Sequence, residues 1–476
     1  DVYKRQTLTL EWVGLFPGKR ESRRFNGLYT LTQQDVINQS IHYDAVAYGG
    51  WAIDLHPADG VYAGGNGCHQ WHSKGVYQIP YRCYVTPDLD NLFVGGRIIS
   101  SSHVANGTTR VMCTSALGGE VIGRAASICL SKGYKPIDLV DRDRIGLLQS
   151  LLVKNGNFIP GIAVAVEDNL ADSAEISVSS VLELDDLPAD GTWFGLDYPI
   201  AQLIPVNGKV PVVRMNVKAD NATRLVMELR SSSKSENYTP DTIDAVLEFD
   251  LKKDENEIVA DFSYSYATPR YAFICLMKNP EISVPMSGRL VTGLTAVYNY
   301  INPAVSNFGK QVPPEGIGVE EFEFWCPKRR PESKNIAMSF APPLASFNSE
   351  NLRNSYYRPY IGTNAWVAAF DDARPEVCFK WNGRKQIKTI ILYFDTDTDQ
   401  AMETVQMGHF DACVPTCYRE YIVRDSVGKE LYHITGNHQT LNVLELDQPV
   451  TTDAIYVNFV RPCGDVCPGL MGVYVC

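Results

Sequence analysis

The sequence predicts a multidomain α+β and all-β protein, in which one mixed α/β region is followed by two antiparallel β-sandwiches. Two observations predict this class. The 476 residues exceed the roughly 250–300 at which a single hydrophobic core stops growing. Residues 7–150 combine glycine-rich turns with one long helical segment, whereas from residue 157 the apolar residues alternate in short runs between turn residues.

Composition excludes some partners. The apolar fraction of 45% and the charged fraction of 21% are ordinary for a globular protein. A formal net charge of −12 opposes binding to the phosphate backbone, so nucleic acid is not an expected partner. No apolar run approaches the roughly 20 residues of a transmembrane helix, and we expect no transmembrane segment. Oligomeric state is left open.

Strand patterns divide the second half of the chain. Runs such as "VPVVRMNVKA", "TRLVMELRS" and "RYAFICLMK" predict a sandwich over residues 157–325, with "AEISVSSVLEL" near its start. The polar, proline-bearing "CPKRRPESKN" at 326–335 is typical of a domain linker. Runs such as "KTIILYF", "REYIVRD", "LNVLEL" and "AIYVNFV" predict a second sandwich over residues 340–476.

The start of the chain, "DVYKRQ" at 1–6, has neither an initiator methionine nor the pattern of a signal peptide, and we interpret it as a non-native scar. On this interpretation the native N-terminus is missing, and the compartment is undetermined, with export possible.

The most informative stretch is "NLFVGGRIISSSHVANGTTRVM" at 91–112. Leu92–Val94 read as a buried strand, and the following pair of glycines lets the chain pass close to a bulky group. A helix is expected over about 109–132, with Thr108 or Thr109 as its cap. Its interior glycines Gly118, Gly119 and Gly123 cost about 3 kcal/mol of helix propensity together, so close packing against a strand or a flat ligand must compensate. An ordinary strand, turn and packed helix is the alternative.

The segment "DNLFVGGRIISSSHVANGTTRVMCTSALGGEVIGRAASICLSKG" resembles the flavin-binding C-terminal part of FAD-dependent oxidoreductases related to glutathione reductase. "GKRESRRFNGLYTLTQQDV", "GGWAIDLHP" and "YQIPYRCYVTPDLDNL" are similar to the part of that family that covers the flavin. The resemblance implies FAD as the cofactor and a helix N-terminus aimed at its ring. The cofactor-binding residues that it implies are Gly95, Gly96, Arg97, Ser100, Thr109, Arg110, Val111 and Met112.

Catalytic candidates are His103, between the expected strand and helix, and the weaker His56 and Arg82. A structural role is the alternative for His103, and Arg23 and Arg24 fit ion pairs equally well. The family's Gly-x-Gly-x-x-Gly turn, which binds the FAD pyrophosphate, is absent from the sequence. We therefore interpret the chain as a C-terminal fragment that is inactive alone.

Residues 340–476 loosely resemble a discoidin or galactose-binding-like jelly roll. Trp366, Tyr356 and Tyr357 are candidates for stacking on sugar rings, with a place in the sandwich core as the alternative. The leading hypothesis is thus an FAD-dependent oxidoreductase that takes a hydride from an organic donor, a small molecule or a carbohydrate. The alternative is a carbohydrate-binding or structural β-sandwich protein with a vestigial flavin-like segment.

Cysteines and sequons give weaker signals. The pairs Cys413/Cys417 and Cys463/Cys467 are spaced for a disulfide or zinc, but unpaired thiols are the expectation. A cluster of Cys68, His69, His72 and Cys83 matches no common metal site, and we predict no metal. The Asn-x-Ser/Thr sequons fall at Asn38, Asn106, Asn221 and Asn237, and we interpret them as chance because Asn106 lies inside the expected cofactor segment.

Overall fold

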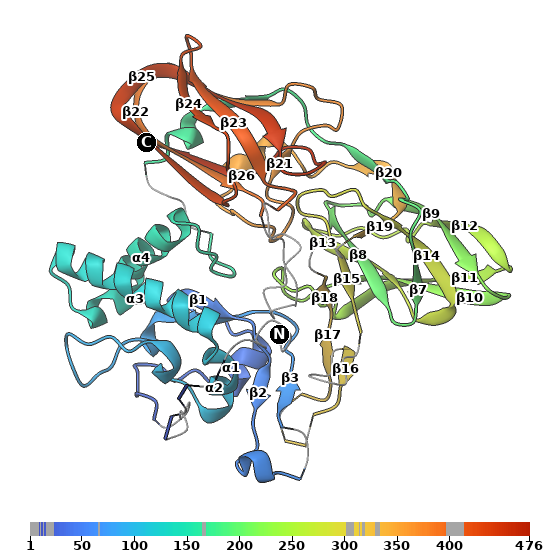
Figure 1. The fold of residues 1–476 in the computed structure, drawn as a ribbon, viewed down its shortest axis with the longest axis horizontal. Coiled ribbons are helices and arrows are strands. Elements are labelled where there is room, and N and C mark those ends of the chain that lie inside the picture. The colour runs from blue at the N-terminus through green and yellow to red at the C-terminus, as the bar shows by residue number, and fades with distance from the viewer. Residues whose placement is uncertain are drawn as a thin grey trace.

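The computed structural model describes residues 9, 11–12, 14–15, 23–64, 67–163, 168–300, 309–313, 315–316, 319–328, 334–396 and 414–476. Figure 1 shows three regions around a common junction. The helical first region is at the lower left, the middle sandwich at the right and the C-terminal sandwich at the top. This arrangement confirms the predicted fold class. No helix in the described ranges is long and apolar enough to cross a membrane.

The first region packs helices against two short antiparallel strand pairs, β1 with β4 and β2 with β3. Its core joins Ala45–Ala47 and Ile79 of the first pair to Val121 and Ala125 of the long helix. Its elements are α1 (Gln33–Asn38), β1 (Ala45–Gly49), β2 (Ile53–Leu55), β3 (His69–Trp71), β4 (Tyr77–Pro80), α2 (His103–Thr109), α3 (Met112–Lys132) and α4 (Arg142–Lys154).

The middle sandwich stacks a six-stranded sheet on a seven-stranded one, with alternate residues of both sheets in a single core. The six-stranded sheet has the order β11 (Thr242–Leu251), β10 (Thr223–Ser231), β13 (Arg270–Leu276), β8 (Ile200–Val206), β15 (Ala296–Tyr298), β18 (Cys326–Pro327). The other has the order β19 (Asn335–Ile336), β14 (Asn279–Ser287), β9 (Val212–Ala219), β20 (Met338–Leu344), β6 (Leu184–Leu187), with β12 (Asp254–Ala260) on β9 and β7 (Trp193–Leu196) on β14. A separate hairpin pairs β16 (Gly309–Gln311) with β17 (Phe322–Phe324).

The C-terminal sandwich is built on two long bent strands, whose register shifts let one sheet fold around its core. Its strand order is β21 (Trp366–Val367), β26 (Gly469–Val475), β22 (Glu376–Phe394), β25 (Leu441–Pro462), β23 (Tyr418–Asp425), β24 (Glu430–Ile434), with β5 (Glu175–Val178) on β22.

Strand pairing places two segments outside the predicted ranges. The first part of "AEISVSSVLEL" forms β5, which pairs with β22 and so belongs to the C-terminal sheet. On either side of 326–335, β18 and β19 lie in the two sheets of the middle sandwich, and β20 extends that sandwich to Leu344. This part of the chain therefore passes between sheets of one sandwich. The limits of independently folding domains stay a prediction, and residues 1–6 lie outside the described part.

Candidate functional site

The stretch at 91–112 folds differently from its prediction at both ends. Leu92–Val94 do not form the predicted strand. Of these residues only Phe93 pairs, through one isolated β-bridge to Val85. The expected helix over 109–132 is α3, which begins three residues later at Met112, and a separate helix, α2, precedes it and meets it at Arg110 and Val111. Arg110 ends α2 and extended Val111, with ψ of 151°, turns the chain into α3.

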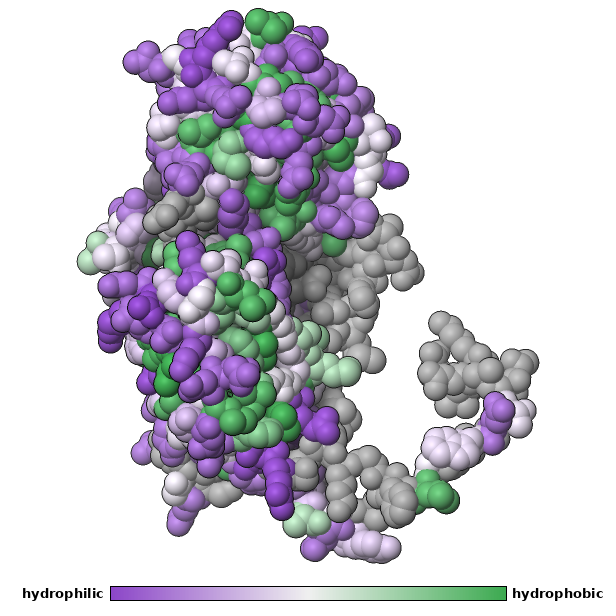
Figure 2. Space-filling view, turned by 90° about the vertical axis from the view of Figure 1, so that its left-hand side faces the viewer, coloured by the Kyte–Doolittle hydropathy of each residue, from purple (hydrophilic) through white to green (hydrophobic). Residues whose placement is uncertain are grey.

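The first turn of α3 is open. Its N-cap is Val111, which has no side-chain oxygen, and no side chain caps the helix, so the predicted cap at Thr108 or Thr109 is wrong. The first amides of a helix without a capping side chain keep free donors and the positive end of the helix dipole. Met112, the first residue of α3, is 88% exposed. Figure 2 shows hydrophobic side chains gathered over the lower half of the face that carries α3 and α4.

Two of the predicted site residues, Arg110 and His56, contact Asp54. The Arg110 guanidinium donates from Nη2 to the Asp54 carbonyl oxygen at 3.1 Å and lies 3.6 Å from Asp54 Oδ2. His56 Nε2 lies 3.4 Å from Asp54 Oδ1. Asp54 is on β2 and His56 follows two residues later, so the extended chain points both side chains the same way. Asp54 was not among the predicted site residues, because Arg110 reaches it from 56 positions away in the sequence.

The two glycines have different surroundings. Gly96 has φ of +66°, a conformation that favours glycine, and a Cβ there would meet nothing within 4 Å. A Cβ on Gly95 would lie 2.6 Å from Ile122 Cδ1. The space beside Gly95 is thus taken by a side chain of α3, whereas the space beside Gly96 is open.

The remaining predicted residues are dispersed. Ser100 is buried, and its hydroxyl lies 3.1 Å from Thr30 Oγ1, so it faces the interior of the first region. Arg97 is exposed, and its carbonyl accepts from Asn106 Nδ2 at 3.0 Å. His103 is the exposed first residue of α2, after the cap Ser102. The Oγ1 of buried Thr109 has no hydrogen-bond partner among the described residues.

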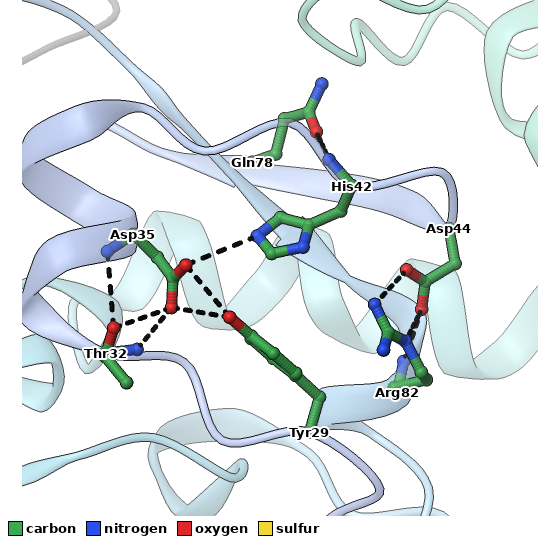
Figure 3. Close-up of polar contacts among 7 residues, drawn as sticks. All are labelled: Tyr29, Thr32, Asp35, His42, Asp44, Gln78 and Arg82. Carbon is green, nitrogen blue, oxygen red and sulfur yellow. Dashed lines mark hydrogen bonds and ion pairs between the residues drawn. The ribbon is translucent and has the colours of Figure 1, made fainter.

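Arg82 belongs to a separate polar network. Its backbone N and Nε donate to Asp44 Oδ2 and its Nη2 donates to Oδ1, each at 3.0 Å, and Asp44 is fully buried. The same guanidinium lies over the rings of Tyr29 and Tyr43, at 5.0 and 5.1 Å from their centroids. Figure 3 shows Arg82 and Asp44 facing each other. The Arg82 guanidinium is thus held by a buried carboxylate, and its predicted catalytic role stays a prediction.

Asp35 forms the second half of this network (Figure 3). It accepts hydrogen bonds from the backbone N and hydroxyl of Thr32, both at 2.8 Å, and from the Tyr29 hydroxyl at 2.9 Å. Burial opposes the charged form, but these hydrogen bonds lower the pKa of Asp35 below its ordinary value. Burial and the bond to Asp35 raise the pKa of Tyr29 to about 12. Burial lowers the pKa of His42, whose Nε2 is 3.9 Å from Asp35 Oδ1.

Neither of the two predicted cysteine pairs is joined by a disulfide bond between its own members, because each pair contains a free cysteine. Cys417 and Cys467 are free, and Cys463 is disulfide-bonded. Cys463 is therefore not bonded to its close neighbour, and Cys413 lies outside the described residues. Within the described part of the chain, no group of three or more His, Cys, Asp or Glu side chains is placed to hold a metal ion.

Of the aromatic residues considered for sugar stacking, Trp366 is core. It is fully buried and donates from Nε1 to the Ser180 carbonyl at 2.9 Å. Tyr357 stacks on Tyr393 with ring centroids 3.7 Å apart, while Tyr356 is half-buried. Carbohydrate binding by this sandwich stays a prediction.

Whether these residues fit a flavin depends on the start of α3. Its uncapped first amides and the cationic Arg110, which ends α2, suit an electron-rich group at this turn, whereas Gly96 follows Gly95, which packs on Ile122 well inside α3. The hydroxyl of Thr109, without a partner among the described residues, adds a polar atom next to that turn. The space beside Gly95 is occupied by Ile122, so it leaves no room for a ligand there. The residues present therefore fit one edge of a flavin.

Comparison with known proteins gives two results. Residues 2–152 match the sequence model of a family described as FAD dependent oxidoreductase, which confirms the predicted resemblance of the first region. No curated protein matches the chain.

Several solved structures of carbohydrate-binding modules align with 27–28% of this chain. They include chitosan-binding module 1 of a Paenibacillus chitosanase/glucanase, with 9% identity, 86% of its length covered and a TM-score of 0.21. The family 32 modules of Streptococcus pneumoniae EndoD and Clostridium perfringens NanJ align with 11% and 9% identity, 86% and 85% coverage, and TM-scores of 0.21.

Proposed function

We propose that the first region supplies one edge of the flavin site of an FAD-dependent oxidoreductase. The observation that carries the proposal is the open first turn of α3, with Arg110 directly before it. A reduced flavin gathers negative charge along one edge of its ring system. Free backbone amides at a helix start, with a guanidinium beside them, stabilise negative charge at that position.

Asp54 is proposed to position Arg110. A guanidinium held at the Asp54 backbone carbonyl and near its carboxylate loses little freedom when a second anionic partner approaches. Asp54 is also within ion-pair distance of His56 Nε2, which is exposed. We propose that His56 exchanges a proton with solvent or substrate, and that His103 is the second candidate for this role.

The proposed reaction is the transfer of a hydride from an organic donor. Bound flavin would supply the electron-accepting ring, and the chain would supply charge stabilisation and proton transfer. A carbohydrate donor is proposed without a specific identity. Because the sequence holds no glycine-rich dinucleotide turn, we expect this chain to bind FAD weakly and to be inactive alone.

The test is a titration of the purified chain with FAD, followed by visible difference absorbance under oxidising conditions and after reduction with dithionite. We expect a saturable difference spectrum with tighter binding of the reduced form, because only that form carries the extra negative charge. Arg110→Gln should weaken binding of reduced FAD about ten-fold, the loss of one charge-assisted hydrogen bond.

Arg214→Gln is the matched control, because Arg214 is an exposed arginine of the middle sandwich, 3.9 Å from Glu257. It should bind as the native chain does. Absence of any saturable flavin spectrum, or equal binding by the native chain and the Arg110 variant, would overturn the proposal. Thermal unfolding of the Arg110 variant separates loss of a ligand contact from loss of the fold.

A further inference from the structure

A cavity lies between the middle sandwich and the C-terminal region. It has a volume of ≈ 450 Å³ and is lined by the loop after β10, by the start of β13 and by Ile361 of the C-terminal region. The same loop is tied to the first region, because Asp241 accepts from Lys74 Nζ at 3.0 Å and Asn237 bonds to Gln39. The cavity walls therefore come from segments fixed at several points.

Two cations line this cavity. Lys234 and Arg270 are half-buried, and neither has a carboxylate within 4.0 Å among the described residues, although Arg270 lies over the Tyr266 ring at 5.1 Å. The chain as a whole has a net charge of −12, so this cavity differs in sign from the protein's overall charge. Unpaired cations beside a cavity attract an anion.

The nearest acids do not neutralise them. Asp241 is already bound by Lys74 and by the hydroxyl of Ser233 at 2.6 Å. Glu236 is buried, and burial raises its pKa although Lys234 opposes the shift, so its charged form is disfavoured. A third carboxylate, that of buried Asp395, acts on Tyr271 in the cavity wall, so Lys234 and Arg270 offset it in part.

The cavity lining also includes a hydroxyl group, that of Ser232, without a hydrogen-bond partner among the described residues. Its Oγ is buried. A buried polar atom without a partner destabilises the fold, and a ligand oxygen would supply the missing partner. The lining also has an apolar part, formed by Tyr271, Phe273 and Ile361.

We propose that this cavity binds a small organic anion, whose carboxylate or phosphate oxygens meet Lys234, Arg270 and the Ser232 hydroxyl and whose body packs on Tyr271, Phe273 and Ile361. The volume is too large for an inorganic ion alone and suits a molecule of one or two rings. The site is independent of the flavin proposal, because it uses no residue of the first region.

Three probes with one ring in common test the proposal: glucuronate, glucose 6-phosphate and uncharged glucose. Binding to the intact chain is measured by isothermal titration calorimetry at low ionic strength. Glucuronate or glucose 6-phosphate should bind at least about ten-fold more tightly than glucose, and the tighter of the two identifies the preferred anion.

Arg270→Gln and Lys234→Gln should each lower the affinity for that anion about ten-fold. Lys253→Gln, an exposed lysine of the same sandwich, should leave it unchanged. If Arg270→Gln fails to fold, the anion affinities of Lys234→Gln and Ser232→Ala still test the proposal, because both residues lie in a surface loop and both substitutions should weaken binding. Equal binding of glucose and the anions, no binding of any probe at millimolar concentration, or normal binding by the Lys234 variant would overturn the proposal.

Discussion

The side-chain amides of Gln39 and Asn237 hold each other through two hydrogen bonds. Gln39 Nε2 donates to Asn237 Oδ1 at 2.6 Å, and Asn237 Nδ2 donates back to Gln39 Oε1 at 3.0 Å. Both residues are 4% exposed, and the pair joins the first region to the middle sandwich across 198 positions of sequence. Gly75 packs so closely on Asn237 that a Cβ there would overlap it.

Asn237→Ala should therefore weaken the contact between these regions. The substitution leaves the buried Gln39 Oε1 without its donor, although Nε2 keeps its bond to the Val76 carbonyl at 2.7 Å, and a buried polar atom without a partner costs about 1–3 kcal/mol. We expect a lower midpoint of thermal unfolding and faster limited proteolysis between the two regions. Asn221→Ala removes an exposed amide bonded to Glu281 at 3.1 Å and should change stability by less than about 0.5 kcal/mol. Equal effects of the two substitutions would contradict the prediction.

The ion pair of Arg82 and Asp44 predicts a second, larger effect. Asp44 is fully buried and accepts three hydrogen bonds from Arg82. Asp44→Asn leaves the Arg82 charge partly buried and uncompensated, at a cost of about 3 kcal/mol. The measurement is the denaturant midpoint of the first region, followed by circular dichroism.

Glu257→Gln provides the control for this pair. Glu257 lies 3.9 Å from Arg214 on the surface of the middle sandwich, where both side chains are more than half exposed. Such a pair contributes about 0–1 kcal/mol. A destabilisation by Asp44→Asn no greater than that of Glu257→Gln would show that the buried pair is not structural.

Strands were the most predictable part of the fold. The run "TRLVMELRS" coincides with β10, and "RYAFICLMK" contains β13. A strand carries its signal within its own sequence, as alternation where one face is exposed and as a short apolar run where both faces are buried, as in β13. The pairing of β5 with β22 could not be predicted, since the partners are about 200 residues apart and no local pattern encodes their register.

The candidate site was predictable only in part. Arg110 and the helix behind it were identified from sequence, but the break between α2 and α3 was not, because extended Val111 carries no turn signature. Asp54 and Asp44 were missed for another reason. Each acts through an arginine that tertiary structure brings to it, from 56 and 38 positions away.

Burial of His72 predicts a dependence of stability on pH. Its ring stacks on Phe324 of β17 with centroids 4.4 Å apart, and burial lowers the pKa of His72 to about 3. A histidine with a lowered pKa in the folded state stabilises the fold above its unfolded pKa of about 6.5 and loses that contribution as the pH falls. We expect a loss of about 1.4 kcal/mol between pH 7.5 and 5.5 from this residue.

The measurement is the unfolding midpoint at both pH values for the native chain and for His72→Gln. The variant should show a smaller decrease on acidification, with a remainder from His42, whose pKa is also lowered by burial. His69→Gln, at an exposed position of β3, is the control and should leave the decrease unchanged. An identical decrease in His72→Gln and the native chain would refute the assignment.

The glycines of α3 predict opposite effects from identical substitutions. A Cβ on Gly118 would lie 2.8 Å from Cε1 of buried Tyr84, whereas Cβ atoms on Gly119 and Gly123 would meet nothing within 4 Å. Each glycine-to-alanine change gains about 1 kcal/mol of helix propensity, but at Gly118 overpacking against a fixed ring costs about 1–3 kcal/mol.

Gly118→Ala should therefore destabilise the first region by up to about 2 kcal/mol, while Gly119→Ala and Gly123→Ala each stabilise it by up to about 1 kcal/mol. Thermal unfolding of the three variants in parallel provides the measurement, and each serves as a control for the others. Stabilisation by Gly118→Ala equal to that by Gly119→Ala would show that Tyr84 moves aside. The close contact between α3 and Tyr84 would then not explain why residue 118 is glycine.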